Sequence, residues 1–515
     1  MKQPNLILPY TLHQLFSNAG QAWARCDYQE SLELLERGSQ LDPANIQILL
    51  NLGQRYGLRY QYADAEGCFE RAIRVAPNKA EVMAMAGSIS AEFDNYSMAE
   101  RFFKQALEQK NVTPDMVARL AEIYERLRRA EDAAALVERA LQLDNGCPLA
   151  RLIQAKLHRQ AGKMAEAEAV LRPALTCASR ELRIRSFYEL GAIYDRQGRY
   201  DDAMTAWLDA KALLRSDAPP LLAQLKLINN ILLEMKQNIT AEHLARWFDY
   251  GQEIFQPPQR LALLAGHSRS GTTLLEQVLD SHPGIVSAEE TYIFRFDAYA
   301  PLRFPLPKEM SILDGLDGMN NASLIKARER YFQSMSAWLG QPLGQRLLVD
   351  KNPSLQNLIP AFVRIFPETK LIIALRDPRD VILSCFMQPH WPIMTGSVSY
   401  LSLEDSVASY NLGMDVWRTL QPILKNPVLE VRYEDMVEDL ETVARKTLDF
   451  LEVPWDAKVL GFDEHARKKM VRSPTYADVT QPVYKRAKGR WQHYRKYLEP
   501  HLEKLEPFVK AFGYG

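Results

Sequence analysis

The sequence predicts a multidomain chain: an all-α repeat solenoid over residues 1–217, capping helices and a linker over 218–258, and an α/β domain with a mainly parallel sheet over 259–515. Two observations predict this division. Small residues recur every 34 positions in the first half, as in a helical repeat array. After the turn-forming segment Gln256–Gln259, a short apolar run, a glycine loop and a helical pattern open the second half.

The 34-residue spacing aligns about six copies of the repeat. Position 8 of each copy is small: Ala19, Gly53, Gly87, Ala121, Ala155 and Gly191. Position 20 is also small: Ser31, Ala65, Ala99, Ala133, Ala167 and Ala203. Position 24 is bulky: Leu35, Phe69, Phe103, Val137, Leu171 and Trp207. Antiparallel helices approach closely where small residues lie at their crossing, so we expect the bulky position to fill the gap to the next pair.

This pattern resembles the tetratricopeptide repeat. The resemblance implies a superhelix whose concave surface binds a peptide or a partner protein. Between residues 218 and 250 the small positions stop while the apolar spacing stays helical, which predicts capping helices. A chain lacking residues 1–215 is therefore expected to keep the binding site of its second half.

Composition narrows the class of protein further. The chain has 515 residues with 63 basic and 64 acidic side chains, and the two signs also balance on each side of Pro258. This excludes bulk binding to nucleic acid or to a membrane surface. The five cysteines are scattered, so we expect neither disulfides nor a zinc site. No apolar run approaches a membrane span and no signal peptide is recognisable, which predicts a cytoplasmic protein.

The second half begins with a P-loop-like pattern. The apolar run Leu261–Ala265 precedes the sequence GHSRSGTT, and a helical pattern follows. A strand, a glycine loop and a helix aim backbone N–H groups at an anion. A nucleotide triphosphatase carries lysine after the second glycine, where this chain has Thr272, and the cation of this loop is Arg269. The loop therefore predicts anion binding and argues against a P-loop kinase.

Several further blocks follow in order: SAEET, LVDKNP, LIIALRDPRDVILS, VRYED and RSPTYADVTQPVYKRAKGRW. Together with the loop, these blocks resemble the sulfotransferase superfamily over roughly residues 259–500. The resemblance is closest to the tyrosylprotein sulfotransferase branch and its bacterial tetratricopeptide relatives. It implies transfer of a sulfuryl group from 3′-phosphoadenosine-5′-phosphosulfate (PAPS) to a hydroxyl, with adenosine 3′,5′-bisphosphate as product. No metal is implied, because there is no carboxylate cluster to hold magnesium.

The resemblance also implies residue roles in nucleotide binding. The residues implied to bind the 5′-phosphosulfate are Arg269, Ser270, Gly271, Thr272 and Thr273, and those implied to bind the 3′-phosphate are Arg376 and Ser384. Tyr433 matches a tyrosine that contacts the ligand, and Ser473 matches a serine that contacts the sulfonate or the 3′-side phosphate. Lys488, Gly489 and Arg490 match a basic segment that closes over the nucleotide. Three structural alternatives stay open: Arg376 pairing with Asp377 or Asp380, Tyr433 as a core aromatic, and the basic run as a solvated face.

For catalysis, the resemblance assigns Glu290 as general base and Lys351 as the cation that stabilises the leaving oxygen. Glu289, His267 and His282 are rival bases, although the DSHP turn around His282 favours a structural role. The glutamate pair could instead cap a helix, and Lys351 could be a surface lysine.

Two departures from the tyrosylprotein pattern concern the acceptor and the loop. Ser268 replaces the proline that commonly precedes the loop arginine, and Tyr292 stands where that branch has an arginine. The favoured acceptor is a protein or peptide tyrosine, because a peptide-binding array is joined to a domain of this branch. The alternatives are a small-molecule or carbohydrate hydroxyl, and a repeat scaffold whose enzyme domain is inactive.

Overall fold

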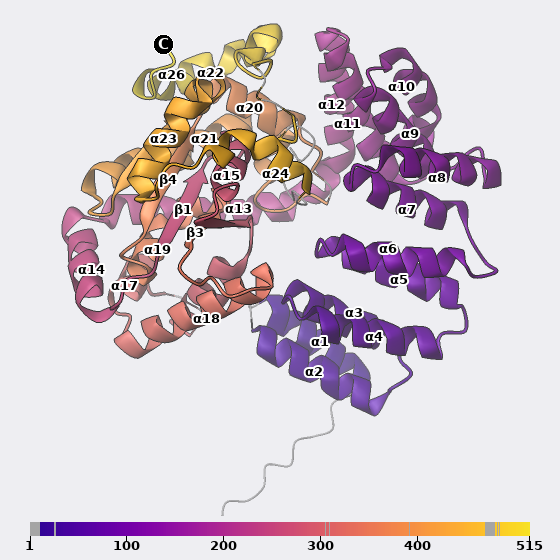
Figure 1. The fold of residues 1–515 in the computed structure, drawn as a ribbon, viewed down its shortest axis with the longest axis horizontal. Helices are drawn as coiled ribbons and strands as arrows, with labels where there is room; N and C mark the ends of the chain where they lie inside the picture. Colours follow the sequence, from indigo (N-terminus) through magenta and orange to yellow (C-terminus); the bar gives the residue numbers. More distant parts are fainter. Residues whose placement is uncertain are drawn as a thin grey trace, which may run out of the picture. The chain divides into compact units, whose positions relative to one another are not determined.

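The computed structural model describes residues 11–24, 27–303, 305–307, 309–390, 392–468, 479–481, 483 and 485–515. The chain divides into two compact units, Met1–Ala174 and Leu175–Gly515 (Figure 1). The domain limits after residues 217 and 258 stay predictions.

Ten helices in the described part of the first unit form five antiparallel hairpins. They are α1 (Leu12–Ala24), α2 (Tyr28–Leu41), α3 (Ile46–Leu58), α4 (Tyr62–Val75), α5 (Lys79–Glu92), α6 (Tyr96–Leu107), α7 (Pro114–Arg126), α8 (Ala130–Leu143), α9 (Pro148–Gln160) and α10 (Met164–Leu171), followed by η1 (Arg172–Thr176). The sixth hairpin, α11 (Arg180–Arg196) and α12 (Tyr200–Leu214), opens the second unit. The helical repeat array predicted from the 34-residue spacing is confirmed.

The small and bulky repeat positions meet inside each hairpin. A Cβ atom on Gly53 would lie 2.4 Å from the Phe69 ring, and one on Gly191 would lie 2.2 Å from Trp207. Position 24 therefore packs on position 8 of its own repeat. Phe69 also meets Phe102 of the next hairpin, with ring centres 5.8 Å apart, so here it fills the gap to the next pair as expected. The alanines at position 20 are fully buried, because only a methyl group fits where the two helices cross.

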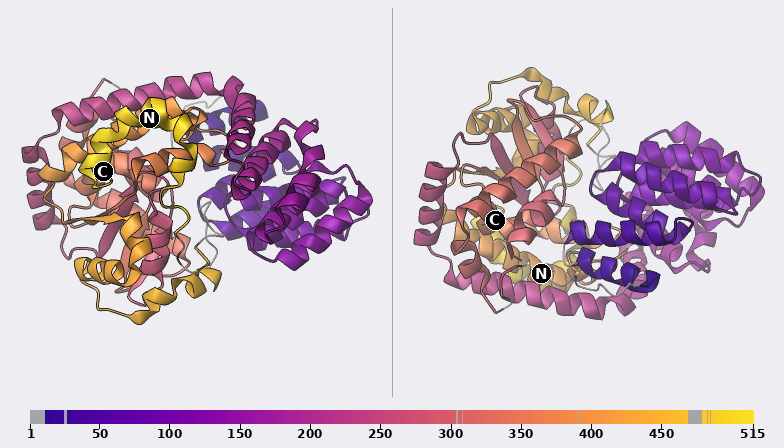
Figure 2. Two further views of the ribbon diagram at one scale, coloured as in Figure 1. Left: turned by 90° about the horizontal axis from the view of Figure 1, so that it is seen from above. Right: turned by 90° about the horizontal axis from the view of Figure 1, so that it is seen from below.

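The remaining elements of the second unit build the α/β part. They are η2 (Arg215–Asp217), α13 (Ala218–Asn238), α14 (Ala241–Ile254), β1 (Leu261–Gly266), α15 (Thr272–Asp280), β2 (Ile285–Glu289), η3 (Phe294–Tyr299), α16 (Ala300–Arg303), α17 (Ile312–Asp317), α18 (Asn321–Leu339), β3 (Leu347–Lys351), η4 (Pro353–Leu358), α19 (Ile359–Ile365), β4 (Lys370–Leu375), α20 (Pro378–Met387), η5 (Val398–Leu401), α21 (Leu403–Leu420), η6 (Gln421–Ile423), β5 (Val428–Arg432), α22 (Tyr433–Glu438), α23 (Leu440–Leu451), η7 (Ala457–Gly461), α24 (Phe462–Lys468), η8 (Arg490–Tyr494), α25 (Arg495–Leu498), η9 (Glu499–His501) and α26 (Leu502–Ala511). Helices α13 and α14 pack on α21 and α19, and Figure 2 shows α13 as a long helix along the outside of the α/β part.

The five described strands form one sheet in the order β2-β3-β1-β4-β5, and every neighbouring pair is parallel. This confirms the predicted α/β domain with a mainly parallel sheet. The chain passes from one side of β1 to the other between β3 and β4. Ligands of open α/β sheets bind outside the carboxyl ends of the strands at such a reversal, so the topology places the site at that edge.

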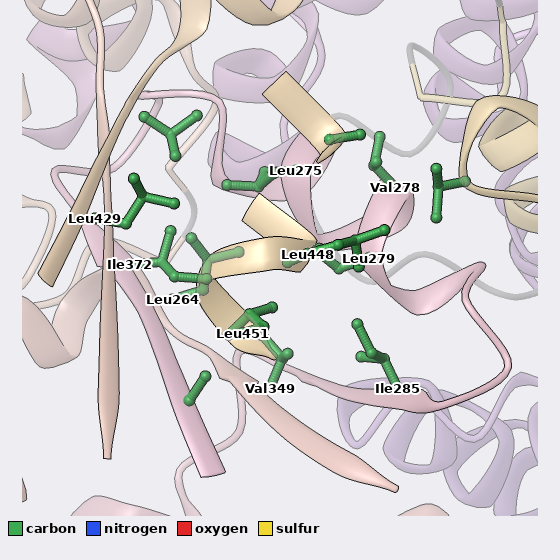
Figure 3. Packing of buried hydrophobic residues seen from close by; sticks show 14 of the residues in the cluster. Leu264, Leu275, Val278, Leu279, Ile285, Val349, Ile372, Leu429, Leu448 and Leu451 are labelled. Atoms are coloured by element: carbon green, nitrogen blue, oxygen red, sulfur yellow. The ribbon is translucent and has the colours of Figure 1, made fainter. Parts of the chain in front are cut away.

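One face of the sheet is covered by α15 and α23. The apolar side chains of β1, β3 and β4, among them Leu264, Val349 and Ile372, pack against Leu275 and Leu448 (Figure 3). All five side chains are almost fully buried. Because both ends of α15 are held by this packing, the loop before it has a rigid support.

No helix in the described part of the chain is long and apolar enough to cross a bilayer. The same residues contain no group of three or more histidine, cysteine or acidic side chains placed to hold a metal ion.

Lys211 ties the sixth hairpin to the α/β part. Its side chain is buried, its Nζ donates to the Tyr400 carbonyl oxygen at 2.7 Å, and it lies 4.0 Å from the centre of the Phe386 ring. Burial lowers the pKa of this ammonium to about 7. The folded protein therefore holds Lys211 largely uncharged above pH 7, whereas an unfolded chain keeps it charged up to about pH 10.4.

The free energy of unfolding of the wild type is expected to rise with pH above neutrality, and Lys211→Met is expected to make this rise less steep. Because the unfolded state binds the extra proton, the wild-type free energy of unfolding should rise between pH 7.5 and 9.5 by about 1.4 kcal/mol per pH unit relative to the variant. Burial raises the pKa of neighbouring Cys385 to about 12 and lowers that of His390 to about 4, so neither titrates in the folded protein in this window. Their titration in the unfolded chain is common to wild type and variant and cancels in the difference. Urea unfolding at several pH values measures the difference, and parallel curves for both proteins would contradict it.

Candidate active site

The carboxyl ends of all five strands carry predicted site residues. Strand β1 leads into the glycine loop, β2 ends next to Glu290, β3 ends at Lys351, β4 ends before Arg376, and β5 ends before Tyr433. In a parallel sheet these ends lie at one edge. The fold thus gathers residues as far apart in the chain as Arg269 and Tyr433.

The loop after β1 is shaped by close backbone approaches. Gly266 has φ 137°, and a Cβ there would lie 2.4 Å from the Ala374 carbonyl oxygen. Gly271 has φ 91°, and a Cβ there would lie 2.7 Å from the Tyr433 ring. Gly271 is also the residue that precedes α15, so the loop delivers backbone N–H groups at a helix N-terminus. Ser270, Thr272 and Thr273 are buried beside it.

Three residues assigned to phosphate binding contact one another. The Arg269 Nε donates to Ser384 Oγ at 3.1 Å, and the Arg376 Nη1 donates to the Arg269 carbonyl oxygen at 3.1 Å. Arg376 is buried against Tyr433, with its guanidinium carbon 4.7 Å from the ring centre. Within the described residues its Nε has no hydrogen-bond partner, and it makes no ion pair with Asp377 or Asp380.

The glycine cradle, the partly buried Arg269 and the buried Arg376 suit a ligand with anionic groups at both ends, because each end would meet its own positive charge. The residues present therefore fit a nucleotide with a 5′ and a 3′ phosphate group. Tyr433 packs as a core aromatic and also faces the loop, so both of its sequence interpretations agree with its position.

The predicted closing segment is held by Asp380 of α20. One carboxylate oxygen accepts from the Gly489 N–H at 2.7 Å, and the other from the Trp491 N–H at 2.8 Å. Burial raises the pKa of this carboxyl to about 6. Arg376 adds a bond from its Nη2 to the Ala487 carbonyl oxygen at 2.6 Å.

Of the other residues assigned to this segment, the Lys488 ammonium lies 3.5 Å from Glu438, and Arg490 pairs with Asp195 on α11. Ser473 lies outside the described residues. The nucleotide roles of Lys488, Gly489, Arg490 and Ser473 stay predictions.

The predicted base and the predicted leaving-group cation form an ion pair. The Lys351 Nζ lies 2.8 Å from Glu290 Oε1, 3.4 Å from Glu276 and 3.5 Å from Glu289. Burial alone lowers the pKa of this ammonium, but the charges of the three carboxylates outweigh burial and raise it above its ordinary value. Lys351 is fully buried and stays protonated, so the surface-lysine alternative is wrong.

Exposure separates the three carboxylates around Lys351. The side chains of Glu276 and Glu289 are almost completely buried, whereas that of Glu290 is 40% exposed. Glu290 follows β2 in the left-handed region with φ 50°, and its N–H donates to the Lys351 carbonyl oxygen at 2.7 Å. The chain therefore presents Glu290, rather than Glu289, to an incoming molecule.

The two rival histidines are placed differently. His282 accepts from the Gly284 N–H at 2.9 Å and lies 2.8 Å from the Pro454 carbonyl oxygen, so both ring nitrogens are used in the turn. His267 is partly buried against the Tyr410 ring, and burial lowers the pKa of its imidazole to about 4. A base with so low a pKa is a poor match for a proton transfer near neutral pH.

Sequence reasoning missed Glu276, which is fully buried on α15 and accepts from Ser287 Oγ at 2.7 Å. A glutamate among the apolar positions of LLEQVL was the available signal, because a buried carboxylate needs a cationic partner. It also missed Asp195, whose partner lies 295 residues further along the chain and leaves no local pattern.

Comparison with known proteins agrees with this geometry. The sulfotransferase family matches residues 262–457, and the tetratricopeptide repeat matches residues 46–76 and 118–181. An uncharacterized protein of Aquifex aeolicus is 27% identical over 265 residues, which are 49% of this chain and 33% of that protein. Protein-tyrosine sulfotransferase 1 of Danio rerio is 26% identical over 294 residues, which are 54% of this chain and 79% of the relative.

Among solved structures, the sulfotransferase domain of the Synechococcus PCC 7002 olefin synthase is 23% identical with a TM-score of 0.34. It covers 46% of this chain and 89% of that domain. The matched part of this chain thus spans a third of the length of the Aquifex aeolicus relative and about four fifths of the Danio rerio one.

Proposed function

Because this chain is a tetratricopeptide-repeat member of the sulfotransferase family, resembling its protein-tyrosine branch, we propose that it transfers a sulfuryl group from PAPS to a tyrosine hydroxyl of a protein or peptide. The observation that carries the proposal is the pair of Glu290 and Lys351 at adjacent strand ends, on the same sheet edge as the anion-binding loop. A base for the acceptor hydroxyl, a cation for the leaving oxygen and a phosphate cradle are together what such a transfer requires.

In the proposed reaction, Glu290 takes the proton of the acceptor hydroxyl as the oxygen attacks sulfur. One S–O bond forms to the acceptor, and the S–O bond to the bridging oxygen of the donor breaks, which releases adenosine 3′,5′-bisphosphate. Glu290 is the accessible carboxylate of the cluster, and its contact with Lys351 fixes its position before the acceptor arrives.

Lys351 supplies positive charge where negative charge develops on the leaving oxygen. Because three carboxylates surround it, the ammonium stays protonated throughout the neutral pH range. Its burial also makes its charge more effective than that of a solvated lysine. This stabilisation is stronger in the transition state than in the ground state, which is the condition for a rate increase.

PAPS supplies the sulfuryl group in this proposal, and its two ends fit the two cationic parts of the site. Arg269, the Gly271 cradle and the start of α15 would hold the 5′-phosphosulfate, while Arg376 and Ser384 would hold the 3′-phosphate. The contact of Arg269 with Ser384 joins the two parts, so one connected set of side chains would bind both ends of the nucleotide.

The acceptor assignment rests on the family branch and on the repeats. Tyr292, in the place of an arginine of that branch, is 54% exposed, so the acceptor surface differs in charge at this point.

The test is mass spectrometry of tryptic peptides from a host lysate incubated with the protein and PAPS. A gain of one SO₃ on tyrosine peptides supports the proposal, and a gain confined to small metabolites or carbohydrates contradicts its acceptor. No gain, with PAPS bound, favours an inactive scaffold.

Arg376→Ala is expected to weaken binding of adenosine 3′,5′-bisphosphate by about 2–3 kcal/mol, because a charge-assisted contact to the 3′-phosphate is lost. Binding of adenosine 5′-phosphosulfate, which has no 3′-phosphate, should barely change. Calorimetric titration of both nucleotides measures the difference. Equal weakening of the two would show that Arg376 acts through the fold, for which its bonds to Arg269 and Ala487 give a physical route.

A further inference from the structure

The segment predicted to close over the nucleotide is anchored to two elements, α20 and α11. The backbone N–H groups of Gly489 and Trp491 bind Asp380 on α20, next to the phosphate-binding arginines. The side chain of the intervening residue, Arg490, pairs with Asp195 on α11. Three consecutive residues are therefore fixed between the nucleotide site and the sixth hairpin of the repeat array.

Asp195 contacts this segment with both carboxylate oxygens. The distance from Oδ2 to Arg490 Nη2 is 2.5 Å, and Oδ1 accepts from the Tyr494 hydroxyl at 2.7 Å. The Asp195 side chain is 11% exposed and that of Arg490 is 32% exposed, so water screens the pair only partly. Tyr494 is fully buried, and its ring lies 5.3 Å from Tyr200 and 5.8 Å from Trp207 of α12.

The negative charge of Asp195 offsets the positive charge of the closing segment. The chain around the closing segment is strongly basic, with ten basic and two acidic side chains between residues 464 and 496. Like charges repel one another, and a loop of this length gains entropy when it is released. The partly buried Asp195 carboxylate, which binds the Arg490 guanidinium and the Tyr494 hydroxyl, holds the segment in place against this repulsion and entropy.

We propose that Asp195 is a positioning residue of the nucleotide site: it holds Arg490 and Tyr494 so that the Lys488–Gly489–Arg490 turn stays against α20. The inference rests on the proposed function, because it takes this turn to be part of the PAPS site. It assigns the sixth hairpin to the catalytic unit, where the 34-residue pattern alone would assign it to partner binding. Asp195 acts through Arg490 and Tyr494 and touches no nucleotide itself.

The test uses the full chain and adenosine 3′,5′-bisphosphate as probe. Asp195→Asn keeps the shape of the side chain and removes its charge, so the dissociation constant and the KM for PAPS should rise about tenfold, with kcat at saturating PAPS unchanged. Asp195→Glu should restore part of the affinity. A double-mutant cycle with Arg490→Gln should be non-additive, because either change breaks the same pair.

Asp201→Asn is the matched control. Asp201 lies at the start of α12 and binds Lys496 and Tyr497, so it also joins the sixth hairpin to the C-terminal segment, but beyond the closing turn. It should leave the dissociation constant unchanged. If Asp195→Asn lowers the melting temperature strongly, Tyr494→Phe tests the same contact without a change of charge and should weaken binding less than tenfold.

The outcomes separate the inference from the proposed function. If the wild-type chain does not bind adenosine 3′,5′-bisphosphate, the proposed function fails. If the wild type binds it and Asp195→Asn binds equally well, the positioning role is overturned. An equal loss in the Asp201→Asn control, or an additive double-mutant cycle, also overturns that role, because the effect would then belong to the whole interface.

Discussion

Glu290→Gln is expected to lower kcat by roughly 10²–10⁴ while the affinity for PAPS changes little. Glutamine keeps an oxygen that can accept from the Lys351 ammonium, now 2.8 Å from Glu290, so the site should keep its shape and lose only the base. A more acidic phenol acceptor should recover part of the loss, because its proton needs less assistance. Steady-state kinetics with a series of substituted phenols measures this recovery.

Glu289→Gln is the matched control for this change. It replaces the neighbouring carboxylate, which also faces Lys351 but is almost completely buried. If Glu289→Gln lowers kcat as much as Glu290→Gln does, and responds to acidic phenols in the same way, the base is not the exposed glutamate. Near-normal kcat in Glu290→Gln would move the base to Glu289 or to His267.

Replacing Lys351 tests the other half of the same assignment. Lys351→Ala should also lower kcat, but acidic phenols should not rescue it, since the defect lies at the leaving oxygen. The structure adds a second expectation, because Glu276 and Glu289 would be left buried without their cation, at a cost of about 3–5 kcal/mol of stability. The melting temperature of each variant therefore has to be measured with its rate. Equal rescue of both variants would mean that the two roles are not separated.

Much of this architecture could be predicted from local sequence pattern. The helical hairpins follow from small residues such as Gly53 and Ala65, because any larger side chain would meet the opposite helix. The strand, loop and helix around Gly271 are contiguous in sequence, so their geometry is local. The family resemblance alone assigns roles to Lys351 and Glu290, and only the parallel pairing of β2 with β3 explains why the two side chains touch.

The contacts that escaped prediction join residues far apart in the chain. Lys211 and Tyr400 are 189 residues apart, and Asp195 and Arg490 are 295 apart. Each of these residues also fits an ordinary local role, as a polar position on an amphipathic helix or as part of a basic run. Sequence periodicity counts the sixth hairpin with the repeats, whereas its long-range contacts join it to the α/β part.

This difference changes what we expect of truncated chains. A chain beginning at residue 175 keeps α11 and α12 and should bind adenosine 3′,5′-bisphosphate within about threefold of the full chain, because the compact second unit is complete. A chain beginning at residue 218 loses Asp195, Lys211 and Trp207 together. The sequence pattern alone predicts that a cut near residue 215 spares the nucleotide site, and the contacts of these residues now argue for the opposite result.

For the chain that begins at residue 218 we expect at least about a hundredfold loss of nucleotide affinity, because several residues that hold the closing segment are removed together. Removal of α12 also uncovers Tyr494 and Phe386, which are almost fully buried in the complete second unit. Circular dichroism and calorimetric titration of both truncated chains measure folding and binding separately. If the chain from residue 218 folds and binds the nucleotide as well as the chain from residue 175 does, the sixth hairpin belongs to the repeat array in function as well as in sequence. If neither chain binds while the full chain does, the first five hairpins contribute to the nucleotide site as well.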